Sequence, residues 1–214
     1  MTHRHERLLI DLSRWPRRGH YDLFKACSFP YAGITTTVDV SRLVAACRPG
    51  GDRRFLPSML HLVAAAVNAI PNFRYRQEED GVVEYAAIDP SFTVLDRATE
   101  LFYFAIAAWT PDFPAFAAGV AEAQRQAIAA RRLHNPRQDV FYTSCLPWMS
   151  FSQLIQPMGP PPDSIPRIVW GRHDDPAAPG RMAFSVIAHH GFVDGLHIGR
   201  LVEAVSDSLA SVNP

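Results

Sequence analysis

Two adjacent histidines and an aspartate lie close together near the end of the chain, in the segment His189-His190-Gly-Phe-Val-Asp194. A neutral imidazole with a pKa of about 6.5 accepts a proton at neutral pH, so either histidine is a candidate general base. Successive residues of a strand point to opposite faces, so the two rings are poorly placed to bind one metal ion. Histidines near strand ends are more often structural, and Asp194 could simply cap a helix that starts at Gly195. The local pattern alone leaves catalysis as the minority interpretation.

Ser144 and Cys145 form a second candidate group, shortly before Pro147 and Trp148. A serine hydroxyl can donate a hydrogen bond to the oxyanion that forms when a carbonyl is attacked, although a strand serine more often makes a local hydrogen bond. Cys145 is expected to be a small buried apolar residue, because no group in the sequence specifically supports a role as nucleophile.

The elements that must position these residues are a mixture of strands and helices. Strands are predicted over 33–39, 91–96, 101–109, 139–151 with a break at Pro147, 167–173 and 182–190. Helices are predicted over 40–47 with Asp39 or Ser41 as its cap, over 56–70 before Pro71, and over 111–133 and 195–212. A hairpin over 72–88 has Asp80-Gly81 at its turn, and the proline-rich stretch 157–166 has no regular structure. This order predicts an α+β fold with a mixed or mainly antiparallel sheet.

Composition limits the classes of function. The 214 residues are enough for one large domain, and no linker divides them, so a single domain over 1–214 is predicted. Lys+Arg and Asp+Glu both number 21, which argues against nucleic-acid or anionic-membrane partners. The three cysteines suit neither a disulfide framework nor a zinc site. Without a secretory signal or an apolar run of membrane-spanning length, the chain is expected to be soluble and cytoplasmic.

Four segments, in one order over about residues 10–208, resemble the chloramphenicol acetyltransferase family. The segment "HHGFVDGLHIGR" resembles the family's HHxxxDGxHxxR signature, and "SCLPWMSF" its Ser-x-x-Pro-Trp segment. The segment "WPRRGHYDLF" is similar to the N-terminal Trp-x-Arg-x-x-His-aromatic pattern. "LPSMLHLVAAAVNAIPNFRYR" followed by "DPSFTV" resembles the middle section. The resemblance implies a two-layer sandwich of a mixed, mainly antiparallel sheet with helices, assembled as a homotrimer.

The resemblance also implies roles for individual residues. His190 matches the general base, which would let an acceptor alcohol attack acetyl coenzyme A directly, without an acyl-enzyme. Ser144 matches the hydroxyl that donates to the oxyanion. Asp194 matches a structural carboxylate paired with an N-terminal arginine, here Arg17, with Arg18 as the alternative partner. Acetyl coenzyme A is a co-substrate, and neither a metal nor a permanently bound cofactor is implied.

The implied substrate contacts lie at the interface between subunits, where His190 of one chain would face the region of Phe24 and Phe102 of another. The positions that match the acceptor pocket are Phe24, Leu23, Pro30, Thr93, Phe102 and Val169. The positions expected to contact the coenzyme are Trp148, for the pantetheine arm, and Arg172, for a phosphate. Val169 departs from the family, which has a threonine associated with an ordered water there. Leu23 and Pro30 replace bulkier or thiol-bearing residues.

The predicted function is transfer of an acetyl group from acetyl coenzyme A to a hydroxyl of chloramphenicol or a similar small acceptor. One alternative is the same chemistry on a different alcohol or amine, because pocket shape sets acceptor preference. Another is a binding protein that retains the pocket with low turnover, suggested by Val169. A lipoyl-dependent acyltransferase core is disfavoured, because no lipoyl domain, peripheral-subunit domain or linker precedes the catalytic segment.

Overall fold

The computed structural model describes residues 5–47, 50, 53–159, 162–173 and 178–214. The strands are β1 (Arg7–Leu9), β2 (Tyr31–Asp39), β3 (Tyr75–Glu78), β4 (Gly81–Tyr85), β5 (Asp89–Asp96), β6 (Leu101–Ile106), β7 (Val140–Cys145), β8 (Arg167–Trp170) and β9 (Arg181–His189). The helices are α1 (Arg18–Phe24), α2 (Ser41–Ala46), α3 (Phe55–Ala69), α4 (Phe113–Ala130) and α5 (Gly195–Ala210), with the short 3₁₀ helix η1 (Pro71–Arg74) after α3.

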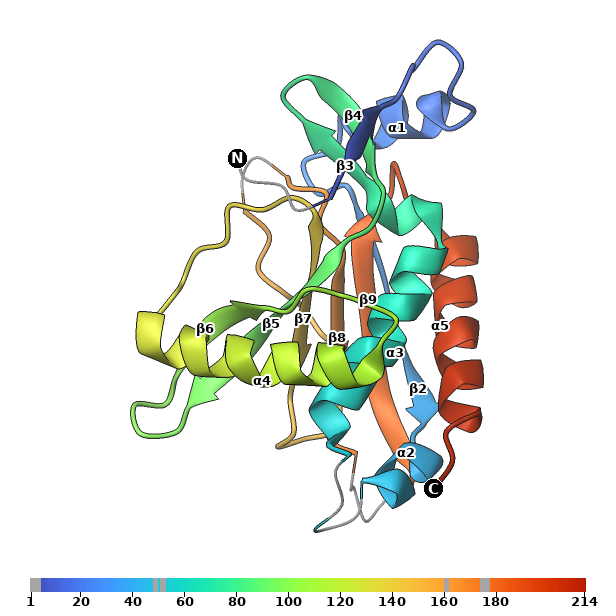
Figure 1. The fold of residues 1–214 in the computed structure, drawn as a ribbon. Coiled ribbons are helices and arrows are strands. Elements are labelled where there is room, and N and C mark those ends of the chain that lie inside the picture. Colours follow the sequence, from blue (N-terminus) through green and yellow to red (C-terminus); the bar gives the residue numbers. More distant parts are fainter. Residues whose placement is uncertain (1–4, 48–49, 51–52, 160–161, 174–177) are drawn as a thin grey trace.

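The main sheet has the strand order β2-β9-β8-β7-β5-β6. The pairs β2–β9, β8–β9 and β5–β6 are antiparallel, whereas β5–β7 and β7–β8 are parallel. Helices α3, α4 and α5 lie side by side on one face of this sheet (Figure 1). The predicted α+β arrangement, with helices against a mixed and mainly antiparallel sheet, is therefore confirmed.

Alternation along the strands separates the two faces of the main sheet. Phe184, Trp170 and Phe141 are buried in the core with the helices, where their apolar area stabilises the sandwich. Because successive side chains point to opposite sides, Ser185 and Ser144 lie on the face that α3, α4 and α5 do not cover. The hydroxyl groups of interest are therefore on the second face.

A smaller antiparallel sheet, β1-β4-β3, lies at one end of the molecule, next to α1 (Figure 1). Trp15 packs against Tyr75 of β3, with ring centroids 5.2 Å apart. Tyr21 of α1 stacks on Phe192 at 5.5 Å. These aromatic contacts join the N-terminal segment to the turn after β9, and they place Arg17 beside that turn.

Most predicted elements are confirmed, with corrections at their ends. The hairpin reverses one residue earlier than predicted, because Glu78 pairs with Gly81 and the loop is therefore 79–80. The N-cap of α2 is Val40 rather than Asp39 or Ser41, although the Asp39 side chain accepts from the Ser41 N–H at 2.9 Å. Strand β1 and helix α1 were not predicted.

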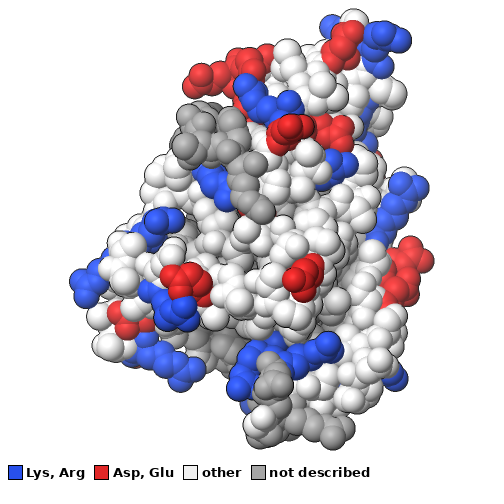
Figure 2. All heavy atoms as spheres, viewed as in Figure 1, with Lys and Arg blue, Asp and Glu red and all other residues white. Residues whose placement is uncertain are grey.

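Charged side chains of both signs are present on the face of the molecule that Figure 2 shows. On the face shown in Figure 2, lysine and arginine are interspersed with aspartate and glutamate among uncharged residues. This agrees with equal numbers of acidic and basic residues in the sequence. In the part of the chain that is described, no helix is long and apolar enough to span a membrane.

Candidate active site

The segment from His189 to Asp194, here called the histidine turn, connects β9 to α5. The ring of His189 is only 3% exposed, and burial lowers its pKa to about 4, so it is neutral at neutral pH. Its Nδ1 accepts a hydrogen bond from the Gly191 N–H at 3.1 Å, which places the ring proton on Nε2. A Cβ at Gly191 would lie 2.9 Å from Cε1 of His189, so only glycine fits against the ring. His189 therefore holds the turn in place.

His190 has the opposite tautomer. Its Nδ1 lies 3.0 Å from the Val193 carbonyl oxygen, which can only accept, so Nδ1 carries the proton. In the neutral ring Nε2 is then unprotonated, and a general base requires this form. The His190 backbone N–H donates to the Pro30 carbonyl at 2.7 Å, which fixes the residue beside the start of β2. The two histidines thus divide into a structural ring and a ring available for proton transfer.

Phe24 stacks on His190 within the same chain, with ring centroids 4.0 Å apart and planes inclined by 26°. The sequence-based expectation assigned the contact between these regions to two different chains. That expectation is corrected for Phe24, because α1 of the same chain brings the phenyl ring to the imidazole. The neighbouring Leu23 side chain is 63% exposed and can contact another molecule.

Arg17 binds the histidine turn at three points. Its guanidinium donates to the Asp194 carboxylate at 3.0 Å, to the Gly191 carbonyl at 2.9 Å and to the His190 carbonyl at 3.3 Å. Arg18, the alternative partner, instead forms an ion pair with Asp22 on its own helix. Arg17 is therefore the arginine that ties the N-terminal segment to the turn.

Asp194 is the N-cap of α5. Its side chain accepts from the Leu196 N–H at 3.0 Å, and the His197 ring accepts from the Asp194 N–H in return. Burial opposes ionisation of Asp194, but the hydrogen bond from Arg17 and the nearby positive charges lower its pKa overall. Among the described residues, the Asp194 carboxylate bonds to Arg17, to the Leu196 N–H and to His197 rather than to the His190 ring, so its role here is to fix the turn and the helix.

Ser144 belongs to a line of side chains across the second face of the main sheet, here called the hydroxyl row. The pairings of β2, β9, β8, β7 and β5 place five residues side by side, namely Thr35, Ser185, Val169, Ser144 and Thr93. Thr35 donates to Ser185 at 3.1 Å, and Thr93 and Ser144 share a hydrogen bond of 2.8 Å. Val169 is 3% exposed and separates the two hydroxyl pairs.

His190 and Ser144 are far apart in one chain. Ser185 is level with Ser144, and His189 follows it by four residues along β9, about 13 Å at about 3.3 Å per residue. Strand β7 is two strands from β9, roughly 10 Å, so the Cα atoms of Ser144 and His189 are roughly 16 Å apart. A base and an oxyanion donor must both lie about 3 Å from the reacting atoms. The structure therefore places these two residues at different parts of one chain.

The remaining predicted site residues lie in two other places. Phe102 is on β6, an edge strand at the far side of the sheet from β2, and is 50% exposed. Trp148 is 60% exposed in the segment after β7. Arg172 follows β8 and is partly buried, and its backbone N–H donates to the Met149 carbonyl at 3.0 Å. The structure therefore brings the segments of Trp148 and Arg172 together, and leaves Phe102 apart.

Residues missed by the sequence analysis share the second face with Ser144. Arg167 is buried, pairs with Asp163 through both carboxylate oxygens at 3.0 and 2.6 Å, and packs over Tyr142 with 5.4 Å between guanidinium and ring centroid. Tyr142 is two residues before Ser144, and Arg167 is two residues before Val169. This two-residue spacing was the available signal, because residues i and i+2 of a strand share a face.

The cysteine beside Ser144 has a different environment. Burial raises the pKa of Cys145 to about 11, so the group is a thiol at neutral pH. A thiol of this kind is a poor nucleophile. The three cysteines of the chain are all unpaired. Among the described residues, no three histidine, cysteine or carboxylate side chains are arranged to hold a metal ion.

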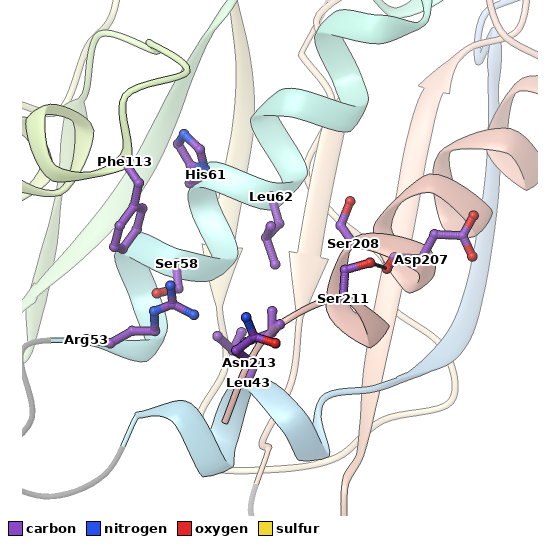
Figure 3. Close-up of a pocket in the computed structure, with 11 residues that line it drawn as sticks. Leu43, Arg53, Ser58, His61, Leu62, Phe113, Asp207, Ser208, Ser211 and Asn213 are labelled. Carbon is purple, nitrogen blue, oxygen red and sulfur yellow. Dashed lines mark hydrogen bonds between the residues drawn. The ribbon is translucent and has the colours of Figure 1, made fainter.

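One cavity, of about 540 Å³, lies on the helical side and contains none of the predicted site residues (Figure 3). It opens between the first half of α3 and the end of α5, with Arg53 lying over the Phe113 ring at 5.5 Å. The Ser58, Ser208 and Ser211 hydroxyls that face it each donate to a backbone carbonyl four residues earlier. Their donors are therefore already used, which argues against a built binding site.

A second cavity, of about 510 Å³, lies over β2 and adjoins the hydroxyl row. It is lined by Thr35, Thr36 and Thr37 on the strand and by the segment from Ser150 to Ser152. That segment continues from Trp148 and packs against Gly171, where a Cβ would lie 3.0 Å from the Met149 carbonyl oxygen. The cavity therefore connects one end of the hydroxyl row with the segment that carries Trp148.

Comparison with known proteins identifies the family of this chain. Residues 6–206 match the family described as chloramphenicol acetyltransferase. Chloramphenicol acetyltransferase 2 of Escherichia coli is 28% identical over 208 residues, 92% of this chain and 93% of that protein. The chloramphenicol acetyltransferase of Streptomyces acrimycini is 30% identical over 209 residues, 94% and 93% of the two chains. A solved chloramphenicol acetyltransferase structure, 23% identical, superposes with a TM-score of 0.82 over 95% of this chain and 100% of that chain. The chain therefore belongs to the chloramphenicol acetyltransferase family of acetyl coenzyme A-dependent acetyltransferases.

Proposed function

We propose that the protein transfers an acetyl group from acetyl coenzyme A to a hydroxyl of chloramphenicol or a similar small acceptor. The observation that carries this proposal is the 3.0 Å contact between Nδ1 of His190 and the Val193 carbonyl oxygen. The Val193 carbonyl holds the proton on Nδ1, so Nε2 has the lone pair that removes a proton from an alcohol. Membership of the family supports acetyl coenzyme A, a thioester, as the acetyl donor.

The reaction follows from these groups in one bound complex. Nε2 of His190 takes the acceptor's hydroxyl proton while the acceptor oxygen attacks the thioester carbonyl carbon. The carbonyl oxygen becomes an oxyanion, to which the Ser144 hydroxyl donates a hydrogen bond. The carbon–sulfur bond then breaks, and the proton held by His190 passes to the coenzyme sulfur, which leaves as a thiol. The protonated Cys145 thiol favours this direct transfer over an acyl-enzyme on that residue.

The separation of His190 and Ser144 supports a site shared by two chains. Within a single chain the Cα atoms of Ser144 and of His189, the residue before His190, are roughly 16 Å apart, so one chain would supply the base and its neighbour the oxyanion donor. A closed homotrimer, as implied by the resemblance, gives three equivalent sites of this kind. Leu23, beside Phe24 and His190, and Phe102, at the opposite edge, are both exposed and would be covered by such assembly.

The segments of Trp148 and Arg172 are proposed to bind the coenzyme. Trp148 is a large exposed apolar side chain two residues before Ser150, which lines the cavity that adjoins the hydroxyl row, and it suits the pantetheine arm. Arg172, held next to Met149, suits a phosphate of the nucleotide. Phe55 stacks on His173 with centroids 4.3 Å apart, and this aromatic pair beside Arg172 extends the same surface.

The test is release of coenzyme A thiol from acetyl coenzyme A when chloramphenicol is added, with His190→Ala as the control. Rapid release by the natural protein and none by the variant is expected, because the variant has no base. Thiol release only with another alcohol or with an amine would support the proposed acetyl transfer but show that chloramphenicol is not the acceptor. Binding of acetyl coenzyme A without release, for every acceptor in a panel, would favour a binding protein. Near-normal release by His190→Ala would contradict the mechanism.

A further inference from the structure

Ser144 needs a defined hydroxyl direction in order to serve as an oxyanion donor. Its hydroxyl has a single proton, and that proton must point at the reacting carbonyl oxygen. In the structure the Ser144 oxygen is 2.8 Å from Oγ1 of Thr93, and either hydroxyl can be the donor in this hydrogen bond. If Ser144 donates its proton to Thr93, that proton is not available to hydrogen-bond to the oxyanion. Catalysis therefore requires Thr93 to donate and Ser144 to accept.

The strand pairing holds Thr93 in the position that this direction requires. Phe92 of β5 pairs with Thr143 of β7, so Thr93 and Ser144 follow as the next neighbours on the second face. A β-branched side chain in a strand has few χ1 rotamers, which fixes the Thr93 hydroxyl more tightly than a serine would. Both residues are partly buried, so the protein limits the water that competes for this hydrogen bond.

The other neighbour of Ser144 in the hydroxyl row has no hydroxyl. Val169 pairs with Ser144 on the β8 side, and it separates Ser144 from the Thr35–Ser185 pair. Among the described residues, Thr93 is the protein group that hydrogen-bonds to the Ser144 side chain. The orientation of the Ser144 hydroxyl thus depends on Thr93.

We propose that Thr93 is a positioning residue, which donates its hydroxyl proton to Ser144 and so directs the Ser144 proton to the oxyanion. This inference rests on the proposed function. It goes beyond the expectation that Thr93 lines the acceptor pocket, because it gives the Thr93 hydroxyl a function through its hydrogen bond with Ser144. No proton is transferred between the two hydroxyls, which keep their O–H bonds throughout the reaction.

The experiment compares Thr93→Val and Thr93→Ser with the natural protein in the thiol-release assay. Valine keeps the β-branched shape without the hydroxyl, and serine keeps the hydroxyl. Thr93→Val is expected to lower kcat by about 10-fold, as misalignment of a catalytic group does, with little change in KM for the acceptor. Thr93→Ser is expected to recover most of kcat. A pocket-lining role would instead raise the acceptor KM in Thr93→Val.

A Ser144→Ala background separates positioning from a general structural effect. Thr93→Val should have no further effect on kcat there, because the hydroxyl that it directs is gone. If the natural protein is active and Thr93→Val lowers kcat by the same factor with and without Ser144→Ala, this inference is overturned and the proposed function is left intact. A natural protein that is inactive with every acceptor would overturn the proposed function, and this inference with it. Circular dichroism of each variant checks that the fold is retained.

Discussion

At the scale of single residues, the two adjacent histidines differ through their backbone partners. His189 receives a proton donor, the Gly191 N–H, whereas His190 faces a proton acceptor, the Val193 carbonyl. Two identical side chains therefore take opposite tautomers, and one of them has Nε2 unprotonated. The backbone conformation of the histidine turn determines each tautomer, because it places an N–H group next to the His189 ring and a carbonyl group next to the His190 ring.

The buried His189 predicts a pH-dependent loss of stability. Its pKa is about 4 in the folded protein and about 6.5 when unfolded, so the unfolded chain binds a proton first as the pH falls. Stability from this residue is complete above about pH 6.5 and is lost progressively down to about pH 4, by about 3 kcal/mol. Urea unfolding at fixed protein concentration measures this slope.

The matched variant for this prediction is His189→Asn. The asparagine carbonyl can still accept from the Gly191 N–H but does not titrate. Its free energy of unfolding should be lower than that of the natural protein at neutral pH, because the larger ring is lost. The difference between the two proteins should narrow between about pH 6.5 and about pH 4. A difference that is constant across this range would refute a neutral buried His189.

Ser144 carries a residue-scale prediction about rate. Ser144→Ala should lower kcat by about 10² to 10³, the loss typical of one oxyanion donor. The melting temperature should change little, because Ser144 is only partly buried and alanine fits the same strand position. Steady-state thiol release and thermal unfolding give the two values. An unchanged kcat would remove Ser144 from the reaction.

At the scale of elements, the histidine turn depends on the segment that precedes α1. Arg17 connects this segment to the carbonyls of His190 and Gly191 and to the carboxylate that caps α5. The N-terminal segment, the histidine turn and the cap of α5 are therefore connected through one guanidinium. Removal of Arg17 would leave the two carbonyls and the carboxylate without these hydrogen bonds.

Arg17→Ala is predicted to destabilise the protein by about 2 kcal/mol, because it removes hydrogen bonds from a charged donor. Arg18→Ala is the control, since its exposed ion pair with Asp22 should contribute little. The pKa of Asp194 is lowered in the folded protein. The stabilisation by the Arg17–Asp194 pair is therefore fully present above pH 3.8, the ordinary pKa of aspartate, and is lost as the pH falls through the lower pKa of the folded state. Equal melting of Arg17→Ala and Arg18→Ala at neutral pH would contradict this role.

The sequence predicted the elements better than their contacts. The helix after Asp194 was clear from its cap and apolar spacing, and β9 from its long apolar run. Helix α1 was missed because it has no side-chain cap and depends on tertiary packing of Tyr21 against Phe192. The Thr93–Ser144 hydrogen bond was also missed, because it requires the order of β5 and β7 in the sheet. The single domain over 1–214 stays a prediction.

At the scale of the whole molecule, one chain keeps the proposed base and the proposed oxyanion donor apart. The register of β7, β8 and β9 sets this separation, and side-chain rotation cannot remove it. If both residues act on one bound substrate, as proposed, they must come from different chains of an assembly. This is testable without knowledge of the interface itself, because the two residues can be removed from different chains.

We predict that His190→Ala and Ser144→Ala chains complement each other when they are co-expressed. Each variant alone should have little activity. Random assembly of equal amounts into a closed ring gives about one quarter of interfaces an intact His190 from one chain and an intact Ser144 from the next. Thiol release should therefore recover to about a quarter of the natural rate. If both residues acted within one chain, every site would lack one of them, and the mixture would be no more active than the separate variants.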